Sequence, residues 1–305
     1  MARDITTEEA REELLSPEEF SYWKMVWKRL KKHKLAMVGM YMLIIIIIIC
    51  LIGPLIYRVD PNYQIEGPYE LLSPGAVDPN GVRHPLGTDD FARDVLARLL
   101  YGGRVSLLIG FSASISAAIV GAVVGLIAGY YGKTVDNILM RITDIFLCLP
   151  TIPLLIALAS VIGKGILQLI FVIVVFGWMT DARLVRGIIL SLKEQEFTEA
   201  ARAIGVPPSR IMFKHLLPNT LAYIIIGTTL GIGSSIIYEA SISFLGFGVQ
   251  APTASWGNML QGAQNYIWRA PFLVFYPGIL IFITVLAFNF FGDGLRDALD
   301  PRLKI

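Results

Sequence analysis

Long apolar segments recur along the chain, and short polar stretches separate them. Six of these segments are about as long as a helix that crosses a hydrocarbon core, which takes roughly 20 residues. They are Leu35–Tyr57, Val105–Gly132, Ile145–Gly163, Gly165–Thr180, Leu216–Tyr238 and Ala270–Gly292. The fourth is short and needs its flanking Lys164 or Asp181 to reach the interface. The pattern predicts an all-α integral membrane protein with six transmembrane helices.

The composition agrees with a membrane setting. Of the 305 residues, 55% are hydrophobic and 16% are charged, and the mean hydropathy is +0.63. A soluble domain of this composition would expose a large apolar surface. The first apolar segment starts at Leu35 and precedes no small-x-small cleavage site, so we expect it to remain as an anchor. Cys50 and Cys148 make no disulfide framework and are expected to pack as small apolar side chains.

The basic residues predict the orientation, because Lys and Arg are retained preferentially on the cytoplasmic side. With both termini inside, 19 of the 26 Lys and Arg residues are cytoplasmic and 7 are outside. The chain then divides into consecutive parts. These are a cytoplasmic tail (1–34), a first transmembrane helix (35–57), an extracytoplasmic loop (58–104), a five-helix core (105–292) that includes a cytoplasmic loop (181–215), and a cytoplasmic tail (293–305).

Two amphipathic helices are predicted outside the spans. Residues 20–34 carry apolar side chains at helical spacing opposite a cluster of lysines, which is typical of a helix among lipid headgroups. As an alternative, this basic flank only sets the topology. In the outer loop, Thr88 can cap a short surface helix that ends near Arg98, followed by a hinge at Tyr101–Gly103.

Small residues spaced four apart mark two of the spans. Such stripes let helices approach closely in lipid, either within this chain or against a second one. They are Gly121, Gly125 and Gly129 in the second span, and Gly227, Gly231 and Ser235 in the fifth.

A charged stretch interrupts the apolar pattern before the fifth span. Residues 194–203 contain good helix formers, Gly205 can supply a left-handed end residue, and Pro207–Pro208 stops any continuation. A second short helix can restart at Ser209 and lead to Pro218, which can open the fifth span. The stretch therefore predicts a helix, a turn and a helix on the cytoplasmic face.

The first of these helices has features of a docking element. Ala200 and Ala201 expose little bulk, so a partner surface could come within backbone distance there. Phe197 and Ile204 would supply apolar anchors. Glu199 and Arg202 would set the orientation.

Three separated segments carry a family resemblance. The charged stretch before the fifth span resembles the Glu-Ala-Ala loop of binding-protein-dependent ABC importer permeases. The matching residues are Glu199, Ala200, Ala201, Gly205, Leu217 and Pro218. His215 stands where that pattern has Ile. Residues 84–107 and 243–260 are similar to signature segments of the dipeptide and oligopeptide permease subfamily. The long first outer loop looks most like that of its C-type subunit.

The resemblance implies a type I ABC importer permease fold in the cell inner membrane. It implies that this chain and a second homologous permease form the pore, that two cytoplasmic ATPases grip their coupling helices, and that an extracytoplasmic binding protein delivers the substrate. The same six motif residues are the expected ATPase contacts. The chain itself is expected to be no enzyme and to hold no cofactor or metal, since ATP and magnesium would bind the ATPases. Lipids are expected partners, and nucleic acid is not. Peptides, nickel chelates and oligosaccharides remain open as substrates.

Other sequence signals are weak. The Gly-Lys-Thr at 132–134 lacks the earlier glycine of a P-loop, because Ile127 occupies that place. The Gly-rich stretch at 246–251 lies in a predicted outer loop without a βαβ pattern. The histidines, which lie in three different segments, make no metal-binding pair; they are His33, His84 and His215.

The last outer loop offers a second candidate surface. Trp256, Tyr266 and Trp268 suit an interfacial aromatic belt. A sharper hypothesis is that Trp256, Asn258 and Tyr266 contact the binding protein or line the outer gate.

Two rival classes depend on carboxylates. An ion-coupled carrier needs ionisable groups deep in its spans, whereas an intramembrane aspartyl protease could recruit only Asp144 and Asp181. We expect Asp144, Asp181, Glu239 and Asp293 to sit at span ends, which disfavours both classes. A lumen without buried charge would suit varied cargo.

Overall fold

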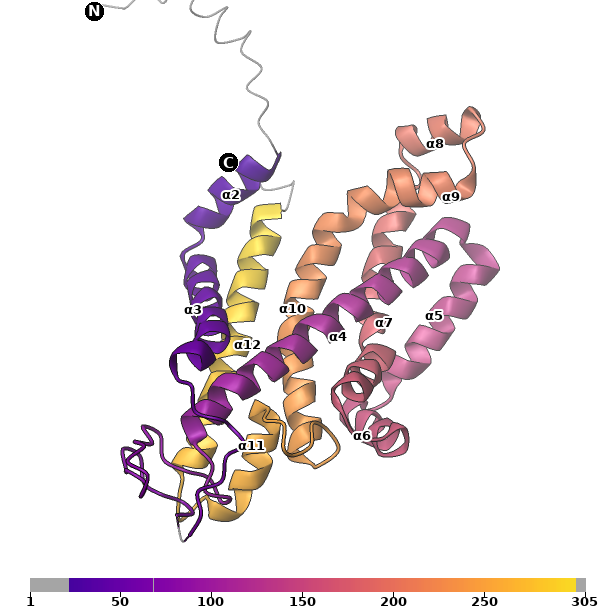
Figure 1. The fold of residues 1–305 in the computed structure, drawn as a ribbon. Helices are drawn as coiled ribbons and strands as arrows, with labels where there is room; N and C mark the ends of the chain where they lie inside the picture. The colour runs from indigo at the N-terminus through magenta and orange to yellow at the C-terminus, as the bar shows by residue number, and fades with distance from the viewer. Residues whose placement is uncertain (1–21, 68, 300–305) are drawn as a thin grey trace, which may run out of the picture.

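The computed structural model describes residues 22–67 and 69–299, and within them the regular structure is helical apart from two isolated β-bridges in a loop. Figure 1 shows the helices side by side, with α2, α8 and the last turns of α12 at one end and α11 at the other. We call these the α8 end and the α11 end. The helices are α2 (Tyr22–Lys32), α3 (Lys34–Ile56), α4 (Val95–Tyr131), α5 (Lys133–Cys148), α6 (Thr151–Ile162), α7 (Ile166–Leu192), α8 (Glu196–Ala203), α9 (Pro208–Arg210), a π-helical turn (Ile211–Leu216), α10 (Leu217–Phe244), α11 (Trp256–Ala263), a 3-10 turn (Gln264–Tyr266) and α12 (Phe272–Leu299).

Five continuous helices and one broken pair account for the six predicted spans. The helices α3, α4, α7, α12 and the stretch Pro208–Phe244 are long and apolar enough to cross a membrane. The predicted third span, Ile145–Gly163, is wrong as a single helix. Its residues belong to α5 and α6, which meet at a bend of 95°. Pro150 causes the break, because a residue before proline is driven out of the helical region, and Leu149 is extended at φ −88° and ψ 145°.

The outer loop lacks the predicted short surface helix, and α4 begins at Val95 instead of Val105. Asp89 prevents helix formation around it, because its Oδ1 accepts hydrogen bonds from the backbone N–H groups of Phe91 and Arg93, both at 2.9 Å. Asp94, rather than Thr88, caps the helix by accepting from the N–H of Ala97 at 2.7 Å.

The predicted hinge at Tyr101–Gly103 is also wrong, since these residues lie inside α4. Both glycines are needed for packing. A Cβ on Gly102 would lie 3.2 Å from the backbone of Ser255, and one on Gly103 would lie 2.7 Å from the ring of Trp256. The helix therefore continues straight past two glycines that admit the α11 segment.

Other helices extend past their predicted ends. The fourth predicted span stops at Thr180, but α7 continues to Leu192, and α12 continues from the predicted Gly292 to Leu299. Asp181 and Glu239, placed at span ends by the sequence, consequently lie inside α7 and α10. The expectation that charge is absent from the spans is therefore wrong.

The predicted glycine stripe of α4 packs against α7, and these two helices make the most extensive helix contact. A Cβ on Gly121 would come within 2.6 Å of the Trp178 carbonyl oxygen, and one on Gly125 would collide with the carbonyl oxygen of Ala182. A Cβ on Gly129 would lie 2.8 Å from Ile189. The stripe thus brings two backbones together, as small-residue motifs do in lipid.

A buried polar network fixes the loop at the α11 end. The ring of His84 lies between two buried carboxylates, with Nδ1 at 2.6 Å from Asp94 and Nε2 at 3.6 Å from Asp78. The hydroxyl of Tyr57, which follows α3, donates to the same Asp94 oxygen at 2.8 Å. His84, which lies in the loop, therefore helps tie the end of α3 to the start of α4.

The helix α2 confirms part of the amphipathic pattern predicted for residues 20–34, while Phe20 lies outside the described residues. Val26 and Leu30 are buried and pack in a cluster with Ile226 of α10 and Leu299 of α12. Trp27 stays exposed. Part of the apolar face therefore contacts protein, and His33 begins the next helix by accepting from the N–H of Ala36 at 3.1 Å.

We expect Gly125→Ala to destabilise the protein, because the added Cβ collides with the backbone of α7, and overpacking of this kind costs about 1–3 kcal/mol. Gly187→Ala on α7 is the matched control, since a Cβ there meets nothing within 4 Å. Thermal unfolding of the detergent-solubilised protein should show a lowered midpoint for Gly125→Ala alone. Equal midpoints for the two variants would contradict the proposed packing.

Candidate functional site

The candidate site is the exposed α8 segment, which connects α7 to the long stretch that begins at Pro208. Figure 1 shows α8 and α9 projecting at one end of the helix array. The chain leaves α7 at Leu192, and the hydroxyl of Thr198 donates to the Leu192 carbonyl oxygen at 2.9 Å. Because Thr198 is fully buried, this bond fixes α8 on the end of α7.

The end of α8 is closed by the glycine that the sequence singled out. Gly205 has φ +77°, as its predicted left-handed role requires. The N–H of Val206 donates to the Ala201 carbonyl oxygen and that of Gly205 to the Arg202 carbonyl oxygen, both at 3.0 Å. These two bonds define a Schellman motif, which ends the helix and turns the chain back toward the helix array.

The two faces of α8 have different environments. Ala201 is buried and packs in a cluster with Val185 and Ile189 of α7 and with Met212 of the π-helical turn. Ala200 is exposed on the other face. The expectation that both alanines offer a surface to a partner is therefore wrong for Ala201, whose small side chain lets α8 pack closely on the rest of this chain.

One face of α8 is exposed, and it carries residues that the sequence proposed for docking. Glu199 and Ala200 are exposed, and they lie between two accessible apolar side chains. Phe197 is 39% exposed and Ile204 is 80% exposed. Exposed apolar groups beside a small residue and a carboxylate are what a protein contact needs.

Leu217 and Pro218 form the first turn of α10, as predicted for Pro218, and they lie where the helical geometry changes. The N–H of Leu217 donates to Met212, five residues earlier, so residues 211–216 form a π-helical turn inside one continuous helical path. Pro218, at the next position, has no N–H for a helical hydrogen bond. The α8 segment is thus joined to α10 without a flexible hinge in these residues.

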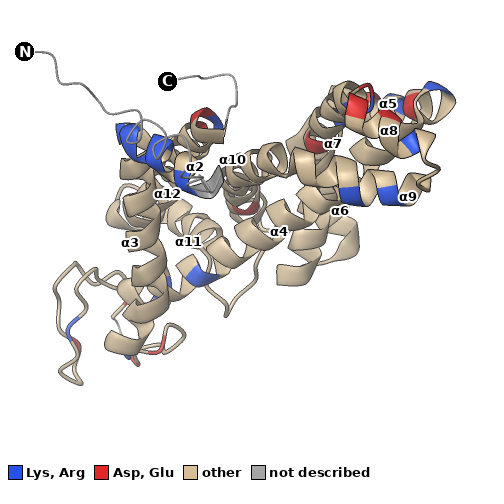
Figure 2. Ribbon diagram, turned by 90° about the horizontal axis from the view of Figure 1, so that it is seen from above, with Lys and Arg blue, Asp and Glu red and all other residues tan. Residues whose placement is uncertain are grey.

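Ion pairs surround this end of the molecule. Arg186 of α7 makes a two-pronged pair with Asp136 of α5, in which Nε lies 2.9 Å from Oδ1. Arg202 of α8 stacks over the ring of Tyr130, with 5.5 Å between the guanidinium carbon and the ring centroid. Figure 2 shows Lys and Arg gathered here and on α2, whereas the helices between carry few charges.

The second candidate surface, at the α11 end, is mostly internal. Trp256 is fully buried, so a direct contact with a partner or a place in the aromatic belt is wrong for it. Asn258 is used locally, because its Nδ2 donates to the carbonyl oxygen of Thr253 at 2.7 Å and its Oδ1 accepts from Ser255 at 3.0 Å. Tyr266 is half-buried, while Trp268 is 97% exposed.

Glu239 connects these segments and was missed as a structural centre. It is fully buried and accepts hydrogen bonds from Ser106 of α4 at 2.9 Å and from Ser243 at 2.8 Å. The Ser106 oxygen in turn accepts from the backbone N–H of Trp256 at 3.1 Å, and the Trp256 indole donates to Leu99 at 3.1 Å. Glu239 therefore fixes α11 against α4 and α10, and its position one residue beyond the predicted span hid this role.

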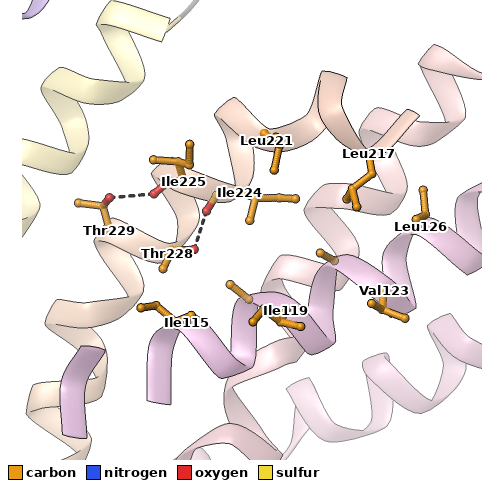
Figure 3. Close-up of a pocket in the computed structure, with 12 residues that line it drawn as sticks. Ile115, Ile119, Val123, Leu126, Leu217, Leu221, Ile224, Ile225, Thr228 and Thr229 are labelled. Atoms are coloured by element: carbon orange, nitrogen blue, oxygen red, sulfur yellow. Dashed lines mark hydrogen bonds between the residues drawn. The ribbon is translucent and has the colours of Figure 1, made fainter. Parts of the chain in front are cut away.

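An apolar groove separates parts of α4 and α10. Its volume is about 380 Å³, and Figure 3 shows its walls. The labelled aliphatic side chains are Ile115, Ile119, Val123, Leu126, Leu217, Leu221, Ile224 and Ile225. Thr228 and Thr229 contribute no free donor, because each hydroxyl donates to the backbone of its own helix, at 2.7 and 2.8 Å. The groove suits lipid chains or apolar side chains and does not suit a polar solute.

A larger cavity of about 720 Å³ lies among α4, α7, α10 and α12. Its lining includes the carboxylate of Asp181 together with several hydroxyl groups. Among the described residues, no group of three or more His, Cys, Asp or Glu side chains could hold a metal ion.

Two family models match the chain. Residues 121–305 match the model described as the binding-protein-dependent transport system inner membrane component. Residues 21–74 match the model described as the N-terminal TM domain of oligopeptide transport permease C.

Named relatives are similar over nearly their whole length. The chain is 42% identical to the dipeptide transport system permease protein DppC of Alkalihalophilus pseudofirmus, over 93% of this chain and 91% of that one. It is 38% identical to the oligopeptide transport system permease protein OppC of Bacillus subtilis, over 96% and 93%. It is 40% identical to the glutathione transport system permease protein GsiD of Escherichia coli O157:H7, over 92% and 91%.

Solved structures agree on the fold. An inward-facing structure of the MetNI methionine ABC transporter has a chain that superposes with a TM-score of 0.51 at 23% identity. The match covers 65% of this chain and 94% of that one.

We expect Gly205→Val to destabilise the turn after α8 by about 1 kcal/mol or more, because a β-branched residue disfavours φ > 0. Gly205→Asn is the matched control, since Asn tolerates this conformation. No neighbouring atom lies within 4 Å of an added Cβ, so backbone conformation alone should separate the two variants. Hydrogen exchange of the α8 amides should accelerate in the Val variant and stay near wild type in the Asn variant, and equal protection would contradict the assignment.

We expect Glu239→Ala to lower the free energy of unfolding by about 2 kcal/mol or more, because two buried serine hydroxyls lose their acceptor and a void remains. Ser241→Ala is the control on the same helix, since its exposed hydroxyl bonds only its own backbone. Thermal unfolding and protease cleavage within residues 245–255 should distinguish the variants. A wild-type unfolding midpoint and cleavage rate for Glu239→Ala would show that the network contributes little to stability.

Proposed function

Because the chain belongs to the family of binding-protein-dependent transport system inner membrane components, we propose that it is the C-type permease subunit of an ATP-driven importer of dipeptides or oligopeptides. Family membership makes it an ABC importer permease, a multi-pass inner membrane protein that is not itself the catalytic subunit. In the proposal it forms one half of a pore, and a second homologous permease forms the other.

The proposed orientation places the α8 end in the cytoplasm. Both α2 and α8 lie at this end, and so do the last turns of α12. Placing that end inside also puts 19 of the 26 Lys and Arg residues on the cytoplasmic side. The α11 end and the loop at 58–94 would then face the binding protein, and the exposed Trp268 would lie at the outer interface.

The proposed coupling element is α8, and the observation that carries it is the contrast between its two faces. The inner face is held by Thr198 and Ala201 against α7 and the π-helical turn, whereas the outer face exposes Glu199 and Ala200. A rigidly mounted helix with an exposed docking face passes a partner's displacement into the spans. Each of two cytoplasmic ATPases would grip one such helix, and ATP with magnesium would bind those subunits.

The six motif residues take different roles in this proposal. Glu199 and Ala200 make the ATPase contact, while Ala201 and Gly205 position the helix from inside and from its end. Leu217 and Pro218 join it to α10 through the π-helical turn. Docking and positioning thus share one motif.

Peptides are the proposed cargo because the relatives are named for dipeptide, oligopeptide and glutathione transport. Nickel chelates and oligosaccharides have no comparable support here. An ion-coupled carrier and an intramembrane protease lose their ground as well, since the chain belongs to a family of importer permeases.

We expect Ala200→Trp to block ATPase docking, because a large ring occupies the place where the partner backbone would approach. The complex is affinity-purified through this chain from gently solubilised native membranes, and the recovered ATPase is quantified. Recovery should fall to about a tenth or less of wild type, which corresponds to a loss of roughly 1.4 kcal/mol. Peptide uptake should fall with it.

The control is Gln264→Trp, which places the same ring at an exposed position of the α11 end, and its ATPase recovery should stay at wild type. Ala201→Trp is a poorer test, because it overpacks a buried cluster and would damage the chain itself. Wild-type ATPase recovery and uptake with Ala200→Trp would refute the docking role. A wild-type chain that purifies without any ATPase would refute the assembly.

A further inference from the structure

The cavity among α4, α7, α10 and α12 extends along much of the membrane-crossing length of α10. Its lining on that helix runs from Ala222 to Tyr238, a separation of about 24 Å at 1.5 Å per residue. A hydrocarbon core is roughly 30 Å thick. A volume of about 720 Å³ is large enough for a small solute. The cavity therefore has the length and volume of a section of a solute pathway.

Asp181 is the one carboxylate that lines this cavity, and it projects from α7 at mid-height. It lies between the glycine stripes, because a Cβ on Gly121 would come within 2.6 Å of its Cβ and one on Gly227 within 2.8 Å of its Oδ1. No hydrogen bond or ion pair joins its carboxylate to another described residue. The glycines leave room for the side chain, while the described residues supply no partner for its charge.

The remaining polar groups of the cavity do not neutralise Asp181. Arg296, near the end of α12, is the one basic residue in the lining, and it makes no ion pair with Asp181 within 4.0 Å. Tyr223, Ser234 and Tyr238 bring hydroxyl groups to the walls. The apolar groove between α4 and α10 has only the hydroxyls of Thr228 and Thr229 among its lining residues, and both are bonded to their own helix, so it lacks a comparable polar lining.

An unpaired carboxylate inside membrane-spanning helices attracts a cation, because the surrounding low dielectric strengthens the charge interaction. Such residues in transport proteins commonly mark a solute pathway. We propose that Asp181 is a cation-accepting subsite in the translocation pathway and binds the ammonium or guanidinium group of the transported molecule. The subsite rests on the proposed function in one respect, namely that a solute passes through this cavity.

A cysteine reporter tests the charge preference without any knowledge of the cargo. Cys50 and Cys148 are replaced by alanine, and Ser234→Cys is introduced two helical turns from Gly227, about 10 Å along α10. The assembled complex in membranes is labelled with a cationic and an anionic methanethiosulfonate. Asp181→Asn should lower the ratio of cationic to anionic labelling rates by about fourfold or more, the effect of one charge at 10 Å even in water.

The matched control is Asp144→Asn, which removes the same charge from a residue outside the cavity lining that pairs with Arg183 at 2.7 Å. Its labelling ratio should stay at the starting value. An unchanged ratio with Asp181→Asn would overturn the subsite, and it is the result expected if a basic side chain of the second permease already neutralised Asp181.

A transport assay tests whether the cation that Asp181 accepts belongs to the transported peptide. In proteoliposomes with the ATPases and the binding protein, import of alanyl-lysine and of alanyl-glutamate is compared between wild type and Asp181→Asn, with Asp181→Glu as the rescue. The Asn variant should lose import of the lysine peptide several-fold relative to the glutamate peptide. Equal losses would overturn cargo recognition at Asp181. If the wild-type complex imports neither peptide, the peptide function fails, and the labelling ratio still decides the subsite.

Discussion

The close contact between α4 and α7 is the constraint on which the rest of the structure depends. Lipid offers no hydrophobic driving force between helices, so association relies on packing, and packing at this distance requires glycine on one side. Gly125 brings the α4 backbone against the Ala182 carbonyl oxygen, and Gly129 does the same one turn later beside Ile189. The paired helices form a stiff unit, and both candidate sites are attached to it.

Each end of this unit is completed by a different kind of interaction. At the α8 end, apolar packing of Ala201 and the bond from Thr198 hold a short helix whose outer face stays free. At the α11 end, Glu239 and Ser106 hold the Trp256 segment through buried hydrogen bonds. In the proposed function, the α8 attachment is the connection through which an ATPase would act on the pore wall. Asp181 lies between the two ends, beside the glycines that join the helices.

The sequence predicted the features that depend on local chemistry. Apolar length located the spans, the four-residue glycine spacing located the helix contacts, and Gly205 was correctly expected to adopt φ > 0. The Glu-Ala-Ala motif identified the family, which the family models and relatives show. The break at Leu149–Pro150 could also have been predicted, because proline restricts the residue before it.

The errors arose where tertiary packing overrides local preference. Gly102 and Gly103 were interpreted as a hinge, but they lie in a straight helix because Ser255 and Trp256 need the space. Ala201 was assigned to a partner, but it faces inward, since one helix face must cover the ends of α4 and α7. The carboxylates were placed at span ends because each predicted span was ended where the run of apolar residues meets a charged residue. Backbone hydrogen bonding does not stop there, and α7 and α10 continue past Asp181 and Glu239.

The central claim is that α8 moves as one body with α4 and transmits motion without bending. The most direct test is a spin-label distance between Ala203 on α8 and Ile119 on α4, both exposed, in the complete complex with and without trapped ATP. The account predicts the same distance distribution in both states, while distances across the pore to the second permease change. A change of ~5 Å, the rise of one helical turn, in the distance between the two labels would contradict the account.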